Sequence, residues 1–251
     1  MFSICVVNQK GGAGKTTSGL TLADALSRTF VGAGKSQRRA NVLVVDADPQ
    51  KTAYKWESRR VQESLPRYPV RVEAVSNLGS VQAWHVEVLG LIEKLGPIDY
   101  LVIDTPPNLQ SLELSAAMQF ADIAIMPFFC HAGNVEALEE LVPYVTYIQD
   151  ERQKNNFAPM EIRVLVNKYT LRRASEVHIF NTVADFSPWP VLETRLKDLV
   201  AYADAHTYHT SLYAMGGPKE ARVTADKLAQ EVIAIAKSKA GETAGQTAEA
   251  A

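Results

Sequence analysis

Residues 8–17 read Asn-Gln-Lys-Gly-Gly-Ala-Gly-Lys-Thr-Thr and lie between two segments of different periodicity. Residues 2–7 form a short apolar run typical of a buried strand, and residues 16–29 carry apolar side chains at helical spacing. Glycines between a strand and a helix allow a nest of backbone N–H donors, to which the helix N-terminus adds a positive dipole end. The segment therefore predicts a phosphate-binding loop in which Lys15 and the Thr16 hydroxyl reach terminal phosphates and Mg²⁺.

A second motif follows the apolar run at residues 42–46. Its two carboxylates, Asp46 and Asp48, are separated by one residue, so strand alternation sends both toward the same side. They would then lie at the carboxyl end of the strand, where open α/β sheets bind their ligands. Asp48 before Pro49 also fits a helix cap, and this segment alone leaves that alternative open.

The same arrangement recurs at residues 100–104, an apolar run that ends in Asp104. A carboxylate at this place is suited to hold Mg²⁺, usually through water, because Mg²⁺ keeps much of its hydration shell. A single strand that ends in Asp is common. The phosphate loop followed in order by two such strands is a far more specific pattern, and it predicts a nucleotide site with a metal.

Together the motifs resemble those of the ParA/MinD family. Gln9 stands where the usual loop has its first glycine, and an additional lysine, Lys10, precedes the glycine pair, as in that family's deviant Walker A pattern K-G-G-x-G-K-[ST]. The resemblance implies an ATP- and Mg²⁺-binding P-loop NTPase in which Lys10 reaches across a dimer interface to the phosphates of the other subunit. It assigns nucleotide binding to Gly11, Gly12, Ala13, Gly14, Lys15, Thr16, Thr17 and Asn167.

The acidic motifs receive roles by the same resemblance. Asp48, the second aspartate of D-x-D-P-Q, positions the attacking water, and Asp46 supports the metal site and the switch. Asn167, which follows the apolar run 162–166, contacts the adenine. A lone Asn after a strand is otherwise a turn former, and the residues alone favour that interpretation. Catalysis is thereby assigned to Lys10, Lys15 and Asp48, and metal binding to Thr16, Asp46 and Asp104.

The pattern of the whole chain predicts an α/β fold: a doubly wound, mostly parallel sheet with helices on both faces. At 251 residues with 47% hydrophobic content, we expect one domain over residues 1–239 and a disordered polar tail at 240–251. The last helix, residues 225–239, carries Leu228 and Val232, which we expect to pack on the sheet. Strands are predicted at residues 4–7, 42–46, 70–74, 100–104, 123–128, 162–166 and 191–192, with helices such as 81–95 and 135–149 between them.

Other features bear on location and chemistry. Cys5 and Cys130 are expected to be reduced, buried thiols of a cytoplasmic protein, and no C-x-x-C pair exists for an iron–sulfur cluster. The first predicted strand lies at the start of the sequence, so we expect neither a signal peptide nor an N-terminal helix-turn-helix segment. Residues 32–36, Gly-Ala-Gly-Lys-Ser, look like half a phosphate loop but follow a helix, so we expect a surface turn.

Function is implied by the resemblance to short ParA-type proteins: an ATP-dependent homodimer that binds double-stranded DNA without sequence preference, lies on the nucleoid and moves a cargo such as a plasmid or chromosome. A ParB-like or adaptor partner would accelerate a slow hydrolysis. The net charge of −2 gives no global attraction to DNA, so a local basic patch is required. Candidates are Arg172, Arg173, Lys197, Lys219 and Arg222, and second in rank Lys51, Lys55 and Arg59, although each is individually typical of a solvated surface charge.

A MinD-like ATPase at a membrane, or a division or conjugation accessory protein that acts on a protein partner without DNA, is the alternative. A membrane-binding relative would end in a basic amphipathic helix with bulky apolar residues on one face. The C-terminal sequence does not show that pattern, so no membrane partner is expected.

Overall fold

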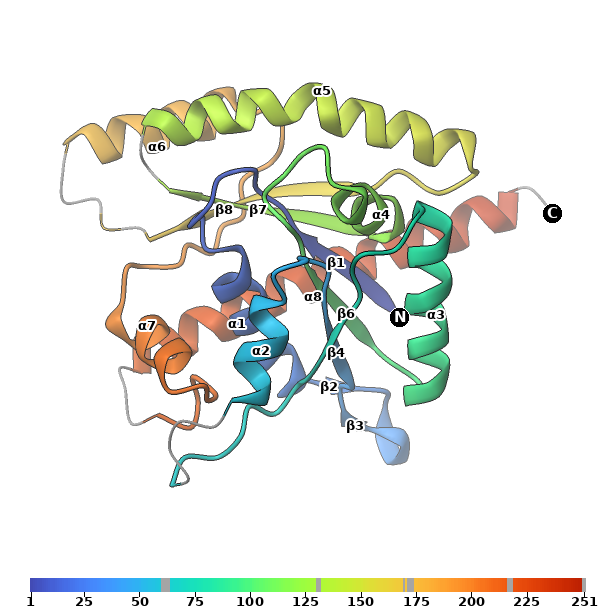
Figure 1. The fold of residues 1–251 in the computed structure, drawn as a ribbon, viewed down its shortest axis with the longest axis horizontal. Helices are drawn as coiled ribbons and strands as arrows, with labels where there is room; N and C mark the ends of the chain where they lie inside the picture. The colour runs from blue at the N-terminus through green and yellow to red at the C-terminus, as the bar shows by residue number, and fades with distance from the viewer. Residues whose placement is uncertain (60–63, 130–131, 169, 171–173, 216–218, 250–251) are drawn as a thin grey trace.

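A six-stranded parallel sheet forms the centre of the computed structural model, which describes residues 1–59, 64–129, 132–168, 170, 174–215 and 219–249 (Figure 1). The strand order is β5-β4-β6-β1-β7-β8, so the first strand lies in the interior of the sheet and the chain winds outward from it in both directions. This confirms the predicted doubly wound fold. The strands are β1 (Phe2–Val6), β4 (Val42–Asp46), β5 (Arg71–Ala74), β6 (Tyr100–Asp104), β7 (Ile123–Phe129) and β8 (Glu161–Asn167).

Helices cover both faces of this sheet, which explains why its strands are apolar throughout rather than alternating. In β1, Ile4 and Val6 belong to one buried cluster while Cys5 and Val7 belong to the other. The first cluster lies under α1 (Lys15–Ser27), α2 (Thr52–Ser58), α7 (Val200–Thr207) and α8 (Lys219–Glu249). The second lies under α3 (Val81–Leu95), α4 (Leu112–Phe120), α5 (Ala132–Lys154) and α6 (Ala174–Phe186).

The predicted seventh strand at 191–192 is wrong. Val191 forms only an isolated parallel bridge with Val164, and Leu192 donates its N–H to the carbonyl of Val164 at 2.8 Å. Pro188 and Pro190 flank Trp189 just before this segment, and proline has no N–H to donate to a ladder. The segment 190–196 therefore covers the open edge of β8 irregularly.

Backbone N–H groups of this covering segment also have hydrogen-bond partners on a neighbouring helix. The carboxylate of Glu231, on α8, accepts hydrogen bonds from the backbone N–H groups of Glu193 at 2.7 Å and Thr194 at 3.0 Å. Two donors next to the sheet edge are thereby satisfied by a side chain of a neighbouring helix.

Residues 30–39 form a short hairpin that the sequence pattern did not predict as strands. Its strands are β2 (Phe30–Val31) and β3 (Arg38–Arg39), joined by a 3₁₀ turn at Gly34–Ser36, and residues 32–39 are exposed. The glycine-rich segment is thus a surface turn, as expected. Figure 1 shows it at the far end of the sheet from the loop between β1 and α1.

Helix α8 extends to Glu249 in the structure, and the disorder expected at residues 240–251 stays a prediction. Cys5 is buried, and burial raises the pKa of its thiol to about 12. Cys130 lies outside the described residues.

Across the described part of the chain, the structure has no helix with the length and apolar character needed to span a membrane.

Candidate nucleotide-binding site

The loop between β1 and α1 has the backbone of a phosphate cradle. Gly12 and Gly14 adopt φ angles of 74° and 85°, in the left-handed region where a side chain is strained. Gly14 directly precedes the first residue of α1, Lys15, so the positive end of the helix dipole opens onto the loop. A Cβ atom at Gly14 would lie 2.2 Å from Nδ2 of Asn167, so glycine is required there for space as well as for conformation.

A cleft of about 560 Å³ opens next to this loop, within the size range of ligand pockets. It is lined by all the predicted nucleotide-binding residues, Gly11, Gly12, Ala13, Gly14, Lys15, Thr16, Thr17 and Asn167, together with Asp48. The structure therefore brings the loop, the second motif and the end of β8 to one place. Parallel strands end at the same edge of the sheet, which is why motifs far apart in the sequence meet here.

Lys15 is only 8% exposed. Burial lowers the pKa of its ammonium group, and the carboxylates of Asp104 and Asp48 oppose this shift. A buried cation next to a glycine-rich loop is suited to an anionic group in the cleft, because a phosphate supplies the missing counter-charge.

Thr16 lines the cleft and contacts the buried Asp104 behind it. The Thr16 hydroxyl donates to Oδ2 of Asp104 at 2.6 Å, whereas Oδ1 of Asp104 is buried without a hydrogen-bond partner among the described residues. Burial raises the pKa of this carboxyl group to about 7. A buried carboxylate oxygen without a donor, next to a threonine hydroxyl, fits a hydrated Mg²⁺ ion held mainly by nucleotide phosphates. No group of three or more acidic, His or Cys side chains among the described residues forms a separate metal cage.

Asp46 has a different environment from Asp104, its register partner on β6. It is completely buried, and its two oxygens accept backbone N–H groups, Oδ1 from Asp48 at 3.1 Å and Oδ2 from Tyr54 at 2.9 Å. Burial raises the pKa of Asp46, and these hydrogen bonds oppose the shift. The geometry makes Asp46 an anchor for the loop that carries Asp48, whose own side chain is half-buried at the cleft.

Lys10 and Lys15 occupy distinct environments. Lys10 is exposed, and its backbone N–H donates to Oδ1 of Asn8 at 2.8 Å. Asn8 is buried and donates from Nδ2 to the carbonyl oxygen of Pro127 on β7 at 2.7 Å, which ties the start of the loop to the sheet. Asn8 was not predicted as a site residue; its position two residues before Lys10, the lysine that departs from the usual pattern, was the available signal.

Asn167 supports the loop in this structure. Its Nδ2 lies 3.3 Å from both the Ala13 carbonyl and the Ser18 hydroxyl, and the residue is 7% exposed. It therefore contacts the phosphate loop directly while lining the cleft, and the predicted contact with adenine stays a prediction.

The opposite wall of the cleft comes from the segment before α7 and from α7 itself. Of this wall, Lys197 was predicted from the sequence as a candidate DNA contact. The lining residues from this wall are Leu196, Lys197, Asp198, Leu199, Tyr202, Ala203, His206 and Thr207.

The basic residues predicted as candidate DNA contacts lie in different environments. Lys197 pairs with Glu220 in the first turn of α8, so it lies close to the exposed Lys219. Arg222 is half-buried on the same helix. Arg172 and Arg173 lie outside the described residues. In the second-ranked series, Lys55 donates to the carbonyl of Gln50, while Lys51 and Arg59 flank α2.

Comparison with known proteins identifies relatives of this site and fold. Maintenance of carboxysome distribution protein A of Halothiobacillus neapolitanus is 27% identical over 233 residues, which cover 91% of this chain and 94% of that protein. The protein of the same name from Gloeobacter kilaueensis is 33% identical over 124 residues, 49% of this chain and 47% of that protein, so this alignment spans about half of each. Chromosome partitioning protein ParA of Caulobacter vibrioides is 29% identical over 203 residues, 68% of this chain and 71% of that protein.

A solved structure shows the same fold. Cobyrinic acid a,c-diamide synthase from Mycobacterium smegmatis, with a bound ATP analog and magnesium, superposes with a TM-score of 0.66 at 18% identity, and the match covers 93% of this chain and 94% of that one. The family model of the CobQ/CobB/MinD/ParA nucleotide binding domain matches residues 4–212, well over half of the chain. This protein therefore belongs to the CobQ/CobB/MinD/ParA nucleotide-binding family.

Proposed function

We propose that this protein is a ParA-type ATPase that dimerises on binding ATP and Mg²⁺, holds DNA without sequence preference and positions a cargo. The observation that carries the proposal is the different burial of two lysines in one loop. Lys15 is buried in the cleft, where it suits the phosphates of its own nucleotide, whereas Lys10 is exposed ahead of the cradle. The exposure of Lys10 beside the phosphate site, where its backbone N–H donates to Asn8, supports a role for its side chain at a second subunit's nucleotide.

The chemistry follows from the groups around the cleft. Lys15 and the loop amides bind the phosphates, and Thr16 and Asp104 hold Mg²⁺, which neutralises charge on the transferred phosphoryl group. Asp48 orients the attacking water, and Asp46 fixes the backbone that carries Asp48. Lys10 of the other subunit adds a positive charge that is present only in the dimer, so hydrolysis depends on assembly.

Cargo and partners are proposed from the relatives. A plasmid or chromosome is the first candidate cargo, in line with the partitioning protein of Caulobacter vibrioides. A carboxysome is the second, because a carboxysome distribution protein aligns over nearly the whole chain. In each case a ParB-like or adaptor protein stimulates hydrolysis, and the ATP-bound dimer resides on the nucleoid in the cytoplasm.

The membrane-bound alternative is disfavoured by the packing of α8. Leu228 and Val232 are fully buried in the core under this helix, as expected from the sequence, and are therefore engaged within the protein. A membrane-binding amphipathic helix needs such residues on an available face.

Fluorescence anisotropy of a labelled random-sequence duplex tests the proposal. The protein is titrated with ATP–Mg²⁺, with ADP–Mg²⁺ and without nucleotide at fixed salt. We expect binding only with ATP–Mg²⁺ and a steep weakening with salt, because phosphate contacts release counterions. Intact ATP turnover without DNA binding in any state would overturn the DNA-based function and support a protein or membrane partner.

A further inference from the structure

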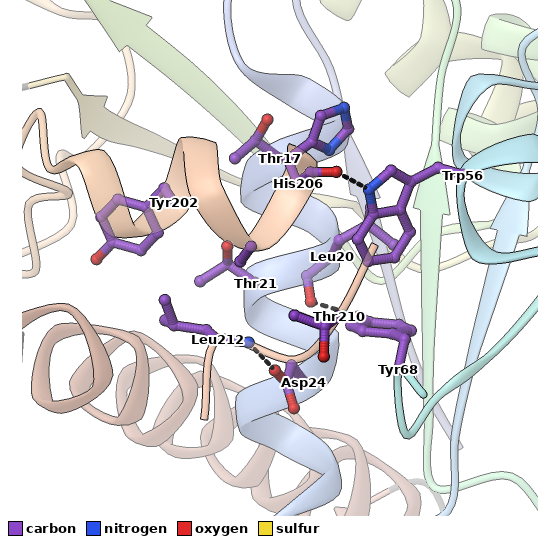
Figure 2. Close-up of a pocket in the computed structure, with 11 residues that line it drawn as sticks. Thr17, Leu20, Thr21, Asp24, Trp56, Tyr68, Tyr202, His206, Thr210 and Leu212 are labelled. Atoms are coloured by element: carbon purple, nitrogen blue, oxygen red, sulfur yellow. Dashed lines mark hydrogen bonds between the residues drawn. The ribbon is translucent and has the colours of Figure 1, made fainter. Parts of the chain in front are cut away.

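The indole of Trp56 on α2 is nearly parallel to two imidazole rings, those of His206, which lines the nucleotide cleft, and of His209. The indole stacks on His206 at a centroid distance of 5.6 Å and an interplanar angle of 11°, and on His209 at 5.7 Å and 15°. His206 is in α7, and His209 lies just after its end. Figure 2 shows Trp56 beside His206, with Tyr68 below it.

Hydrogen bonds reinforce this stack. The indole N–H of Trp56 donates to the carbonyl oxygen of His206 at 2.6 Å, and Nδ1 of His209 lies 2.6 Å from the carbonyl oxygen of Trp56. His209 has a φ of 51°, in the left-handed region that a non-glycine residue rarely adopts. Tyr68 closes the cluster edge-on at 5.0 Å from the indole. One side chain thus joins α2 to α7 through rings and backbone together.

The two elements that Trp56 joins form facing walls of the nucleotide cleft. Asp48 and Thr52 line it from the side of α2, while Tyr202 and His206 line it from α7. Trp56 itself is 5% exposed and is not among the residues that line the cleft, so its indole lies behind the cleft wall.

The beginning of α2 is tied to the Asp48 loop. Lys51 donates its N–H to the carbonyl oxygen of Asp48 at 2.8 Å, and the N–H of Tyr54 binds Asp46 at 2.9 Å. Helix α2 begins four residues after Asp48 and carries Trp56 in its second half, so it links the contact with α7 to the loop that carries Asp48.

We propose that Trp56 is a positioning residue for ATP hydrolysis, which couples closure of α7 over the nucleotide to the placement of Asp48. The inference extends the proposed ATPase function and depends on it. When α7 moves against a bound nucleotide, the stacked indole carries α2 with it, and Asp48 takes up its position relative to the phosphates. Loss of the indole contacts leaves the nucleotide site intact but loosens the water-orienting carboxylate, and misplacement of such a group slows the chemical step more than binding.

Steady-state ATPase assays on Trp56→Phe and Trp56→Ala test this coupling. Trp56→Phe keeps an aromatic ring but removes the indole N–H donor. We expect kcat to fall by about tenfold in Trp56→Phe and further in Trp56→Ala, with KM and the affinity for a fluorescent ADP analogue changed by less than about threefold. Circular dichroism melting confirms that each variant is folded, and Trp56→Phe keeps the test valid if Trp56→Ala is unfolded.

Trp84→Phe is the matched control. Trp84 is also fully buried and donates its indole N–H to a backbone carbonyl, that of Val75 at 2.9 Å, but it belongs to the cluster on the other face of the sheet. We expect its kcat to stay within about twofold of the wild type. An equal loss of kcat in both variants would reduce the role of Trp56 to general packing.

Tryptophan emission gives a second readout. The chain has three tryptophans, so Trp84→Phe combined with Trp189→Phe leaves Trp56 as the only one. We expect ATP–Mg²⁺ to change the emission of this variant. If the wild type neither binds nor hydrolyses ATP, the proposed function fails and this inference with it. If the wild type hydrolyses ATP normally, while Trp56→Phe keeps the wild-type kcat and the emission of Trp56 does not change on addition of nucleotide, the inference alone fails.

Discussion

Gly12 and Gly14 of the phosphate loop should tolerate alanine very differently, although both have positive φ angles, 74° and 85°. An alanine in the left-handed region costs about 1–2 kcal/mol. At Gly12 nothing lies within 4 Å of an added Cβ, so this backbone term is the whole effect. At Gly14 the Cβ would lie 2.2 Å from Nδ2 of Asn167, which must move and lose its hydrogen bonds to Ala13 and Ser18.

Each of those hydrogen bonds contributes about 1 kcal/mol. We therefore expect Gly14→Ala to lower the free energy of unfolding by about 3–4 kcal/mol and Gly12→Ala by about 1–2 kcal/mol. The entropy that alanine removes from the unfolded chain is common to both variants, so it cancels in their comparison. Urea unfolding of the nucleotide-free proteins, followed by far-ultraviolet circular dichroism, measures the difference.

A double-mutant cycle isolates the clash. In an Asn167→Ala background the obstructing amide is absent, so Gly14→Ala should cost only the backbone term of about 1–2 kcal/mol. Equal destabilisation by Gly12→Ala and Gly14→Ala in the wild-type background, or an undiminished effect of Gly14→Ala without the Asn167 amide, would refute the reasoning.

Three further predictions concern the site and its environment. Lys10→Ala should abolish ATP-dependent dimerisation in sedimentation or light scattering while a fluorescent ATP analogue still binds, because Lys15 remains; unchanged dimerisation would contradict the role of Lys10 across the interface. Asp48→Ala should retain ATP in a stable dimer with turnover reduced by roughly 10²-fold, in the range of a lost water-orienting group; normal turnover in a phosphate-release assay would exclude Asp48 from that role. Burial lowers the pKa of His85 below its usual 6.5, so the unfolded chain takes up the proton first as the pH falls. Relative to His85→Gln, the wild type should lose stability in urea unfolding between about pH 7 and about pH 5. If the difference in unfolding free energy between the two proteins stayed constant over this range, a neutral, half-buried His85 would be excluded.

Several parts of the fold and site were predictable because they depend on local patterns. Apolar runs that end in Asp46 and Asp104 predicted neighbouring strand ends, and the structure pairs these two residues in register. The loop at residues 8–17 and its helix followed from glycines between two periodicities. Such features are encoded by residues close together in the chain.

Other parts were not predictable because they arise from tertiary contacts. The division of roles between Asp46 and Asp104 depends on whether backbone N–H groups reach each carboxylate, and no spacing rule contains that information. The α7 wall is defined by tertiary contacts, such as the stack of His206 on Trp56, rather than by a local sequence motif. The irregular segment over β8 could not be predicted without knowing that β8 lies at an edge of the sheet.

The covering of β8 closes one surface through which two copies of a protein can pair. An uncovered strand edge is a template for pairing with any other copy, at any time and without control by a ligand. Here the segment 190–196 lies along β8, and Glu231 occupies the N–H groups of Glu193 and Thr194. This edge of the sheet is therefore not available for strand pairing with a second copy, and the dimerisation proposed above would use the face that bears the nucleotide.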